Sequence, residues 1–174
     1  MERVKKGVFF SLLFLLSALQ ESPAIGEIET IFSPGGRIKE SILKELESTT
    51  STVDLAIHEI TSLEMAQALA KARQRGVKVR VIADSKQANI RTSKITYLIQ
   101  QGILVKVLGG KEKGVMNHRF AILDGDRVLT GSFDWSEASL KWNYENILIV
   151  HGSEAVAAYQ NEFDRLWREK RVIE

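Results

Sequence analysis

The sequence predicts an α/β fold in which helices cover both faces of a mixed β-sheet. Strand-like and helix-like segments alternate from residue 25 onward in this 174-residue chain, the pattern of a sheet sandwiched by helices. The triplet Asp124-Gly125-Asp126 separates two strand-like segments, a tight-turn signal that adds an antiparallel hairpin to the sheet. The chain is long enough for one domain with a buried core, and 44% of its residues are hydrophobic.

The first half of the domain alternates strands and helices. Residues 27–32 read as a short strand, and residues 37–47 carry apolar side chains at helical spacing. Residues 52–60 are mostly apolar and predict a buried strand. Residues 62–75 begin at a serine that can cap a helix and end before a glycine, so a second helix is expected there.

The middle of the chain repeats this alternation. Residues 77–84 are rich in β-branched side chains and predict a strand, and residues 93–101 predict a helix that ends before a glycine. Residues 103–108 predict the next strand. The loop that follows, residues 109–114, is polar and carries Lys111 and Lys113. These lysines either contact a nucleic-acid backbone or belong to a solvated loop.

The last part of the chain predicts a hairpin, a further strand and a long helix. The hairpin strands are expected at 116–123 and 127–130, and the next buried strand at 145–150. Residues 153–170 place large apolar side chains on one stripe, as expected for a helix packed on a sheet. Trp135 and Trp142 lie in the loop between these elements, where they either line a groove or cover the core.

The N-terminal residues have the composition of a targeting segment. Three basic residues precede an apolar run of 13 residues from Gly7 to Leu19, and small residues follow up to Ala24. The run is shorter than the ~20 residues of a typical membrane span. Residues 1–24 are therefore predicted to be a signal peptide or an uncleaved membrane anchor, and the protein exported, periplasmic or membrane-anchored. Residues 25–174 are predicted to form a single domain.

The composition excludes several kinds of chemistry. The chain has no cysteine, so it has no disulfide, no thiolate metal site and no cysteine nucleophile. The formal net charge of +2 permits an anionic partner but does not by itself predict one. Candidate catalytic residues must therefore come from its three histidines and from its carboxylate, amide, hydroxyl and basic side chains.

A group of polar residues in VMNHRFAILDGDRVLTGSFDWS (115–136) suggests a phosphate site. In a strand, Asn117 and Arg119 share one face and His118 points to the other. Gly131 and Ser132 lie at the end of the partner strand, where a small residue lets the backbone approach a ligand. Arg119, Ser132 and the nearby backbone amides suit a phosphate group. Asn143 and Glu145 lie at the start of the next strand, which predicts that they join the same site.

This stretch resembles the phospholipase D superfamily, whose motif is H-x-K-x4-D-x6-G-S-x-N, often followed by N-x-E-N. The resemblance extends over most of residues 28–170, and it is greatest for single-motif members of the bacterial endonuclease and mitochondrial cardiolipin hydrolase type. The motif Asp, Gly-Ser pair and N-x-E-N segment fall on Asp124, Gly131-Ser132 and Asn143–Asn146. The motif His, Lys and last Asn fall instead on Asn117, Arg119 and Asp134.

The resemblance implies a phospholipase D-like fold and metal-independent cleavage of a phosphodiester, without a cofactor. One histidine attacks phosphorus and a second protonates the leaving oxygen, so a single-motif chain is expected to work as a homodimer. The implied catalytic positions are Asn117, Arg119, Asp124 and Glu145. The implied phosphate-binding positions are Arg119, Gly131, Ser132, Asp134 and Asn143.

The substitutions leave two functions open. One is a phosphodiesterase that acts on nucleic acid or phospholipid, with His58 or His118 as a substitute base and possible membrane association through residues 7–19. The other is a catalytically inactive relative that binds phosphate groups, nucleic acid or a protein. An amide is neither a nucleophile nor a titrating acid near neutral pH. A carboxylate at Asp134 repels phosphate unless it is neutralised, for instance by a salt bridge to Arg119.

Overall fold

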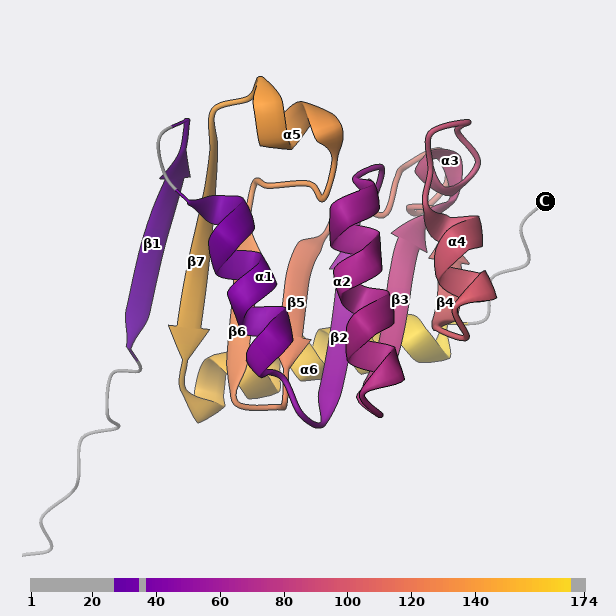
Figure 1. Ribbon diagram of the computed structural model, residues 1–174. Coiled ribbons are helices and arrows are strands. Elements are labelled where there is room, and N and C mark those ends of the chain that lie inside the picture. Colours follow the sequence, from indigo (N-terminus) through magenta and orange to yellow (C-terminus); the bar gives the residue numbers. More distant parts are fainter. Residues whose placement is uncertain (1–26, 35–36, 170–174) are drawn as a thin grey trace, which may run out of the picture.

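The sheet in the computed structural model, which describes residues 27–34 and 37–169, is mixed as predicted. Its seven described strands lie in the order β1-β7-β6-β5-β2-β3-β4 (Figure 1). The strands are β1 Ile28–Ser33, β2 Thr52–Ile57, β3 Lys78–Asp84, β4 Leu104–Leu108, β5 Arg119–Leu123, β6 Arg127–Gly131 and β7 Glu145–His151. The helices are α1 Ile38–Ser48, α2 Leu63–Gln74, α3 Ser85–Ala88, α4 Ile95–Gln100, α5 Glu137–Lys141 and α6 Ser153–Arg168.

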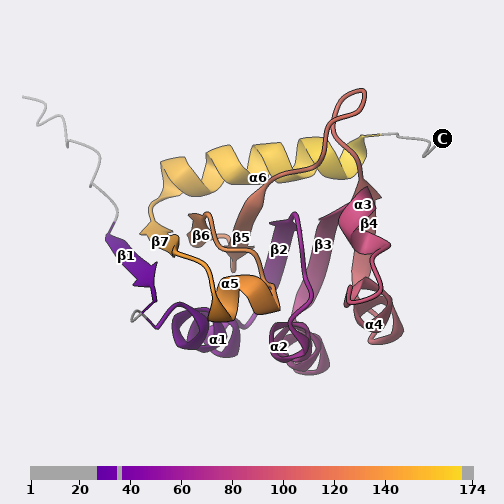
Figure 2. The ribbon, with the colours of Figure 1, turned by 90° about the horizontal axis from the view of Figure 1, so that it is seen from above.

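Helices cover both faces of the sheet. Figure 2 shows α1, α2 and α4 on one face and α6 on the other. Alternate side chains along each strand therefore enter two separate apolar clusters. On the α6 face, the fully buried Phe163 stacks on Trp167, and Arg80 lies 4.8 Å from the Phe163 ring centre. Arg80 also binds both oxygens of the buried Asp54, which fixes this helix over the centre of the sheet.

One edge of the sheet collects the chain segments that carry the motif. Strands β2, β3 and β4 are parallel, so their carboxyl ends lie together. Strand β5 begins at this edge because Arg119 pairs with Ile57, and β6 ends there because Gly131 pairs with Ile147. We call this edge, where β2, β3, β4 and β6 end and β5 and β7 begin, the site edge. Ligands of α/β sheets usually bind beyond such carboxyl ends.

The element boundaries differ from the sequence prediction mainly at the site edge. Strand β2 ends at Ile57 rather than residue 60, and β5 begins at Arg119 rather than residue 116. The short helices α3 and α5 were not predicted. Each begins at a capping side chain, since Asp84 accepts backbone N–H bonds from residues 86 and 87, and Ser136 accepts one from Ser139. Such local capping is hard to recognise in helices of four or five residues.

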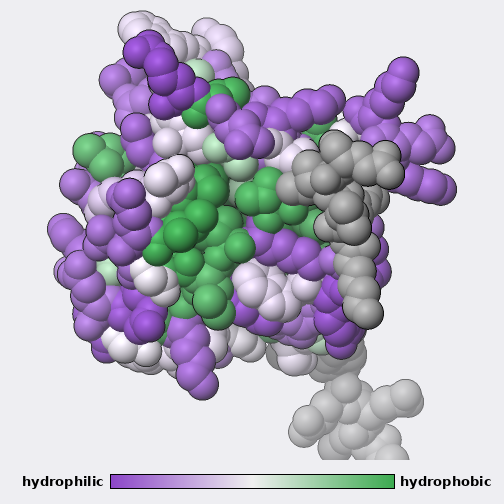
Figure 3. Space-filling model, turned by 90° about the vertical axis from the view of Figure 1, so that its right-hand side faces the viewer, coloured by the Kyte–Doolittle hydropathy of each residue, from purple (hydrophilic) through white to green (hydrophobic). Residues whose placement is uncertain are grey.

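Strand β4 forms one side of the molecule. Apolar side chains gather over this edge strand in Figure 3, and Ile99 and Leu104 are the exposed large hydrophobic residues of α4 and β4, at 55% and 62% exposure. Within the described residues, no helix is both long and apolar enough to cross a membrane. The predicted targeting segment, residues 1–24, lies outside the described residues.

Candidate functional site

Arg119 occupies the centre of the site edge and is held by two neighbours. Its Nη2 lies 2.8 Å from Asp134 Oδ2, and its Nη1 donates to Asn117 Oδ1 at 3.1 Å. The backbone N–H of Glu59 donates to the other oxygen of Asp134 at 3.1 Å. The side chains of Arg119 and Asp134 are only 23% and 11% exposed. Arg119 and Asp134 therefore form the ion pair that was considered as one way to neutralise Asp134.

Little space remains behind this pair. The pocket that borders Arg119 and Gly131 has a volume of ≈ 10 Å³, too small for more than a single water. The Arg119 Nε is buried and has no hydrogen-bond partner among the described residues. A phosphate therefore has to approach Arg119 from the open site edge, and it has to compete with Asp134 for the guanidinium.

Glu145 organises a second group of polar side chains beside Gly131. Its buried carboxylate accepts hydrogen bonds from the Ser132 hydroxyl, from Ser139 Oγ at 3.0 Å and from Asn143 Nδ2 at 2.9 Å. Ser132 Oγ accepts a bond in turn from the backbone N–H of Asn146 at 3.1 Å. Glu145 is thus saturated with donors, which fixes the orientation of Ser132 and Asn143.

Gly131 is required because the backbone of β7 lies very close to it. A Cβ at this position would lie 2.1 Å from the carbonyl oxygen of Asn146. From its sequence, Gly131 was expected to let a ligand approach the backbone. In the structure it makes room for the neighbouring strand β7 instead. Gly131, Ser132, Asn143 and Glu145 are brought together as predicted.

The histidines do not reach this group. His118 turns toward α6, where its Nε2 lies 3.2 Å from Glu162 Oε1 and its ring packs edge-on against Phe120. His58 Nδ1 lies 3.3 Å from the Met116 carbonyl oxygen. His151 ends β7 at the opposite edge of the sheet. Within the described residues, no imidazole hydrogen-bonds to Arg119, Asp134 or Ser132.

Asp124 lies away from the other predicted site residues. It follows β5 at the opposite end from Arg119, about 17 Å away for five residues of strand. Its carboxylate accepts backbone N–H bonds from Thr50, Ser51 and Thr52 at 3.0, 2.7 and 2.9 Å. Burial raises the pKa of Asp124, but these three bonds outweigh it and hold the pKa below its ordinary value. Here Asp124 joins the hairpin turn to the start of β2.

Several contributors were missed by sequence reasoning. The Glu59 amide and the Ser139 hydroxyl hold Asp134 and Glu145, yet neither residue belongs to the motif. Ser136 two residues after Asp134 offered a capping signal for α5, which would have placed Ser139 nearby. Trp135 is buried in the core and Trp142 is 80% exposed, which separates the two roles considered for them.

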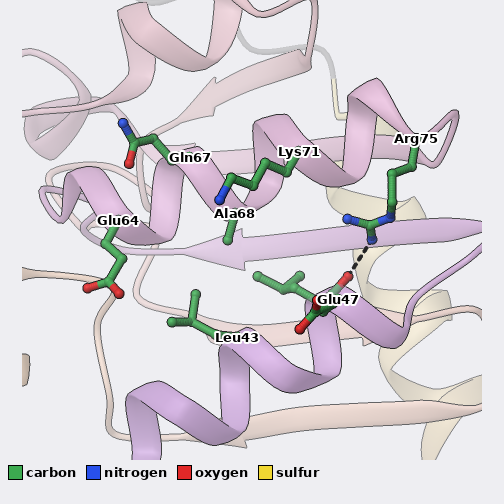
Figure 4. Close-up of a pocket in the computed structure, with 8 residues that line it drawn as sticks. Leu43, Glu47, Glu64, Gln67, Ala68, Lys71 and Arg75 are labelled. Atoms are coloured by element: carbon green, nitrogen blue, oxygen red, sulfur yellow. Dashed lines mark hydrogen bonds between the residues drawn. The ribbon is translucent and has the colours of Figure 1, made fainter.

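Two other features bear on the chemistry. Among the described residues, no cluster of three or more carboxylate or histidine side chains could hold a metal ion. A groove of ≈ 280 Å³ lies between α1 and α2 (Figure 4). Arg75 points into it and donates to the Leu46 carbonyl oxygen at 2.7 Å, which closes the end of α1. None of the motif residues lines this groove.

Comparisons with known proteins agree with this architecture. The family "Cardiolipin synthase, PLD-like domain" matches residues 42–167. The chain belongs to the phospholipase D superfamily. It is 35% identical to a mitochondrial cardiolipin hydrolase of Chlamydomonas reinhardtii over 125 residues, which are 72% of this chain and 55% of that protein. It is 38% identical to the Xenopus laevis mitochondrial cardiolipin hydrolase over 128 residues, 74% of this chain and 60% of that protein. The chain thus spans little more than half the length of these relatives.

Solved phospholipase D-like structures share the fold. Nuc of Salmonella typhimurium, a phospholipase D family member, superposes with a TM-score of 0.77 at 21% identity, covering 84% of this chain and 97% of Nuc. NucT of Helicobacter pylori superposes with a TM-score of 0.68 at 27% identity, covering 80% of this chain and 95% of NucT. The predicted α/β phospholipase D-like fold is therefore confirmed.

The phospholipase D motif is present here with its scaffold retained and its charged centre changed. The retained Gly131, Ser132, Asn143 and Glu145 form the Glu145 group. Two of the changed positions, Asn117 and Asp134, each bind the third, Arg119. At the centre of the motif, the changes therefore leave an ion pair between Arg119 and Asp134, with the amide of Asn117 hydrogen-bonded to Arg119.

Proposed function

We propose that this chain is a phosphodiester-binding member of the phospholipase D superfamily that no longer cleaves its ligand by way of a phosphohistidine intermediate. The observation that carries this proposal is the Arg119 guanidinium, held between Asp134 and Asn117, with no imidazole hydrogen-bonded to it in the described part of the chain. The side-chain amide of Asn117 is not basic enough to attack phosphorus, and it has no acidic proton to transfer to a leaving group near neutral pH. The guanidinium remains a strong donor to phosphate oxygens once Asp134 is displaced.

The ligand we propose is the phosphodiester of a nucleic acid or a phospholipid, bound by a homodimer without a metal. The names of the curated relatives support the phospholipid class, since these proteins are cardiolipin hydrolases. A second chain does not restore the nucleophile, because a homodimer places Asn117 in both copies. We further propose that residues 1–24 direct the chain to export or hold it at a membrane through residues 7–19.

A phosphodiesterase is the second candidate, and the cardiolipin hydrolase relatives favour it. It requires His58 or a rearranged His118 to act as the base. His58 is the better placed of the two, because it follows β2 at the site edge, next to the Glu59 amide that holds Asp134. His118 would have to leave Glu162 first.

One assay separates the two candidates. Purified protein is incubated in EDTA with bis-p-nitrophenyl phosphate, single-stranded DNA, RNA and cardiolipin vesicles, and both binding and cleavage are measured. We expect binding without cleavage. Metal-independent cleavage that disappears in Arg119→Ala and His58→Ala would instead establish the phosphodiesterase. Light scattering tests the dimer, and a monomer at micromolar concentration would contradict it.

A further inference from the structure

Two basic segments follow β3 and β4 at the site edge. Residues 85–94 carry Lys86, Arg91 and Lys94 and no acidic residue. Residues 109–114 carry Lys111 and Lys113 with one acidic neighbour, Glu112. Lys94 is half-buried and the other four cations are exposed. We call these five residues the basic rim.

The cations of the basic rim form no ion pair in the part of the chain that the structure describes, where none of the five lies within the 4.0 Å that defines such a pair with a carboxylate. Lys94 alone is shown to act on a carboxylate: the pKa of Glu137 is lowered mainly by its hydrogen bond to Lys141 and also by the Coulombic attraction of Lys94. The cations near the other end of the site edge behave differently. Lys39 pairs with Glu64 at 3.2 Å and Lys141 with Glu137 at 2.7 Å. The site edge is therefore positively charged at its β3–β4 end and nearly neutral at its β1–β7 end.

Hydrogen bonds hold the basic rim beside the motif. Asp84 caps the segment at Lys86 and also accepts the backbone N–H of Met116 at 2.9 Å, next to Asn117. The Lys86 amine donates to the Lys113 carbonyl oxygen at 3.4 Å, which joins the two segments. The backbone N–H of Lys94 donates to the Ile60 carbonyl oxygen at 2.9 Å. Both ends of residues 85–94 are thus attached to the segments that follow β2 and precede β5, next to the Arg119 site.

Exposed aromatic rings lie at the opposite end of the same edge. Phe32 is the second-last residue of β1, and Trp142 and Tyr144 lie between α5 and β7, with exposures of 63%, 80% and 88%. Seven strands at a spacing of about 4.8 Å separate the two ends by roughly 29 Å. A single lipid headgroup cannot contact both ends, whereas an extended polymer can. Proteins that bind single-stranded nucleic acids combine such backbone-binding cations with aromatic side chains that stack on bases.

We infer that the basic rim binds the phosphate backbone of a single-stranded nucleic acid, which runs along the site edge toward Trp142 and Tyr144. The inference deepens the proposed function because it names the ligand, yet it does not need Arg119 to release Asp134. Affinity for the polymer has its origin in the rim rather than in the changed motif. The contacts are with phosphates and base faces, so little sequence preference is expected.

The test compares two variants of the full chain that lose equal charge. The rim variant is K86Q/R91Q/K111Q/K113Q, and the matched control is K44Q/K71Q/K78Q/R168Q, which changes four exposed cations outside the rim. Binding of a fluorescein-labelled 20-nucleotide DNA is measured by anisotropy at several salt concentrations. We expect the rim variant to lose more than about tenfold in affinity and the control less than about threefold. The slope of log K against log salt should fall by about 3 in the rim variant, at about 0.7 per phosphate contact.

Further measurements keep the inference falsifiable. K111Q/K113Q alters one loop only and replaces the rim variant if the circular dichroism spectrum of the rim variant shows that it has not folded. The affinity of K111Q/K113Q for the DNA should fall by about threefold or more. Trp142→Ala should weaken binding by about fivefold or more through lost stacking. Equal affinities of rim variant and control would overturn the inference. It would also be overturned if anionic phosphatidylglycerol vesicles, but not the oligonucleotide, depended on the rim. The proposed function fails on a different result, metal-independent cleavage by the unaltered chain.

Discussion

Asp134→Asn is the substitution that tests the ion pair most directly. The carboxylate lies 2.8 Å from Arg119, so a phosphate at the guanidinium would have an oxygen about 5 Å from it. At an effective dielectric constant near 20, two unit charges about 5 Å apart repel by about 3 kcal/mol, and partial exposure reduces this to about 1.5–3 kcal/mol. Removing the charge should therefore strengthen phosphodiester binding by roughly ten- to a hundredfold.

The same substitution should weaken the fold slightly. The pair is mostly buried, so its loss is expected to cost about 1–2 kcal/mol, between the values for exposed and buried pairs. The asparagine oxygen can still accept the Glu59 N–H. Urea unfolding measures the stability, and titration with dimethyl phosphate followed by NMR measures the affinity.

Asp126→Asn is the matched control. It removes one negative charge as well, but Asp126 is paired with Arg127 at the opposite end of the hairpin. Bulk electrostatics would raise the phosphate affinity of both variants equally, whereas the ion-pair argument requires the increase in Asp134→Asn alone. Equal affinities of the two variants would refute the reasoning.

Three further substitutions test other parts of the structure. Asp124→Ala should cost about 1–3 kcal/mol in urea unfolding, because three backbone amides lose their acceptor. The pKa of Asp124 is lowered on folding, so its contribution to the free energy of unfolding is present above the unfolded pKa near 3.8 and is lost as the pH falls through the lower folded pKa. If stability fell with decreasing pH in the same way in Asp124→Ala as in the unaltered chain, this would be contradicted. Gly131→Ala should lower the melting temperature by several degrees, since its methyl group meets the Asn146 carbonyl at 2.1 Å, and wild-type melting would exclude that contact. His118→Ala should leave phosphodiester binding unchanged in the NMR titration, because the ring faces Glu162, and a large loss would show that the ring reaches the site.

The sequence predicts the sheet, the long helices and the direction of the motif side chains. The alternation of strand residues separates Arg119 from His118. In the structure Arg119 pairs with Asp134 in the loop after β6, whereas His118 turns to the other side and pairs with Glu162 of α6. This succeeds because periodicity is a local property that the buried sheet enforces. The prediction holds even though β5 begins only at Arg119.

Contacts between distant segments explain what the sequence could not predict. Asp124 belongs to the motif in sequence, yet strand geometry places it at the far end of β5, where it binds the start of β2. Glu59 and Ser139 reach the site through a strand end and a five-residue helix. These positions depend on how loops cross the site edge, which no periodic pattern encodes.

The three changes at the motif centre are best understood as one coupled unit. Arg119 bonds to both Asp134 and Asn117, so a change at either of these positions alters the surroundings of Arg119. Asn117→His alone would place an imidazole beside a guanidinium still occupied by Asp134, and we expect no cleavage of bis-p-nitrophenyl phosphate. The triple variant N117H/R119K/D134N restores nucleophile, cation and neutral amide together, on an unchanged Glu145 group. It should gain metal-independent cleavage. Activity in the single variant equal to that of the triple would show that the ion pair does not block the site.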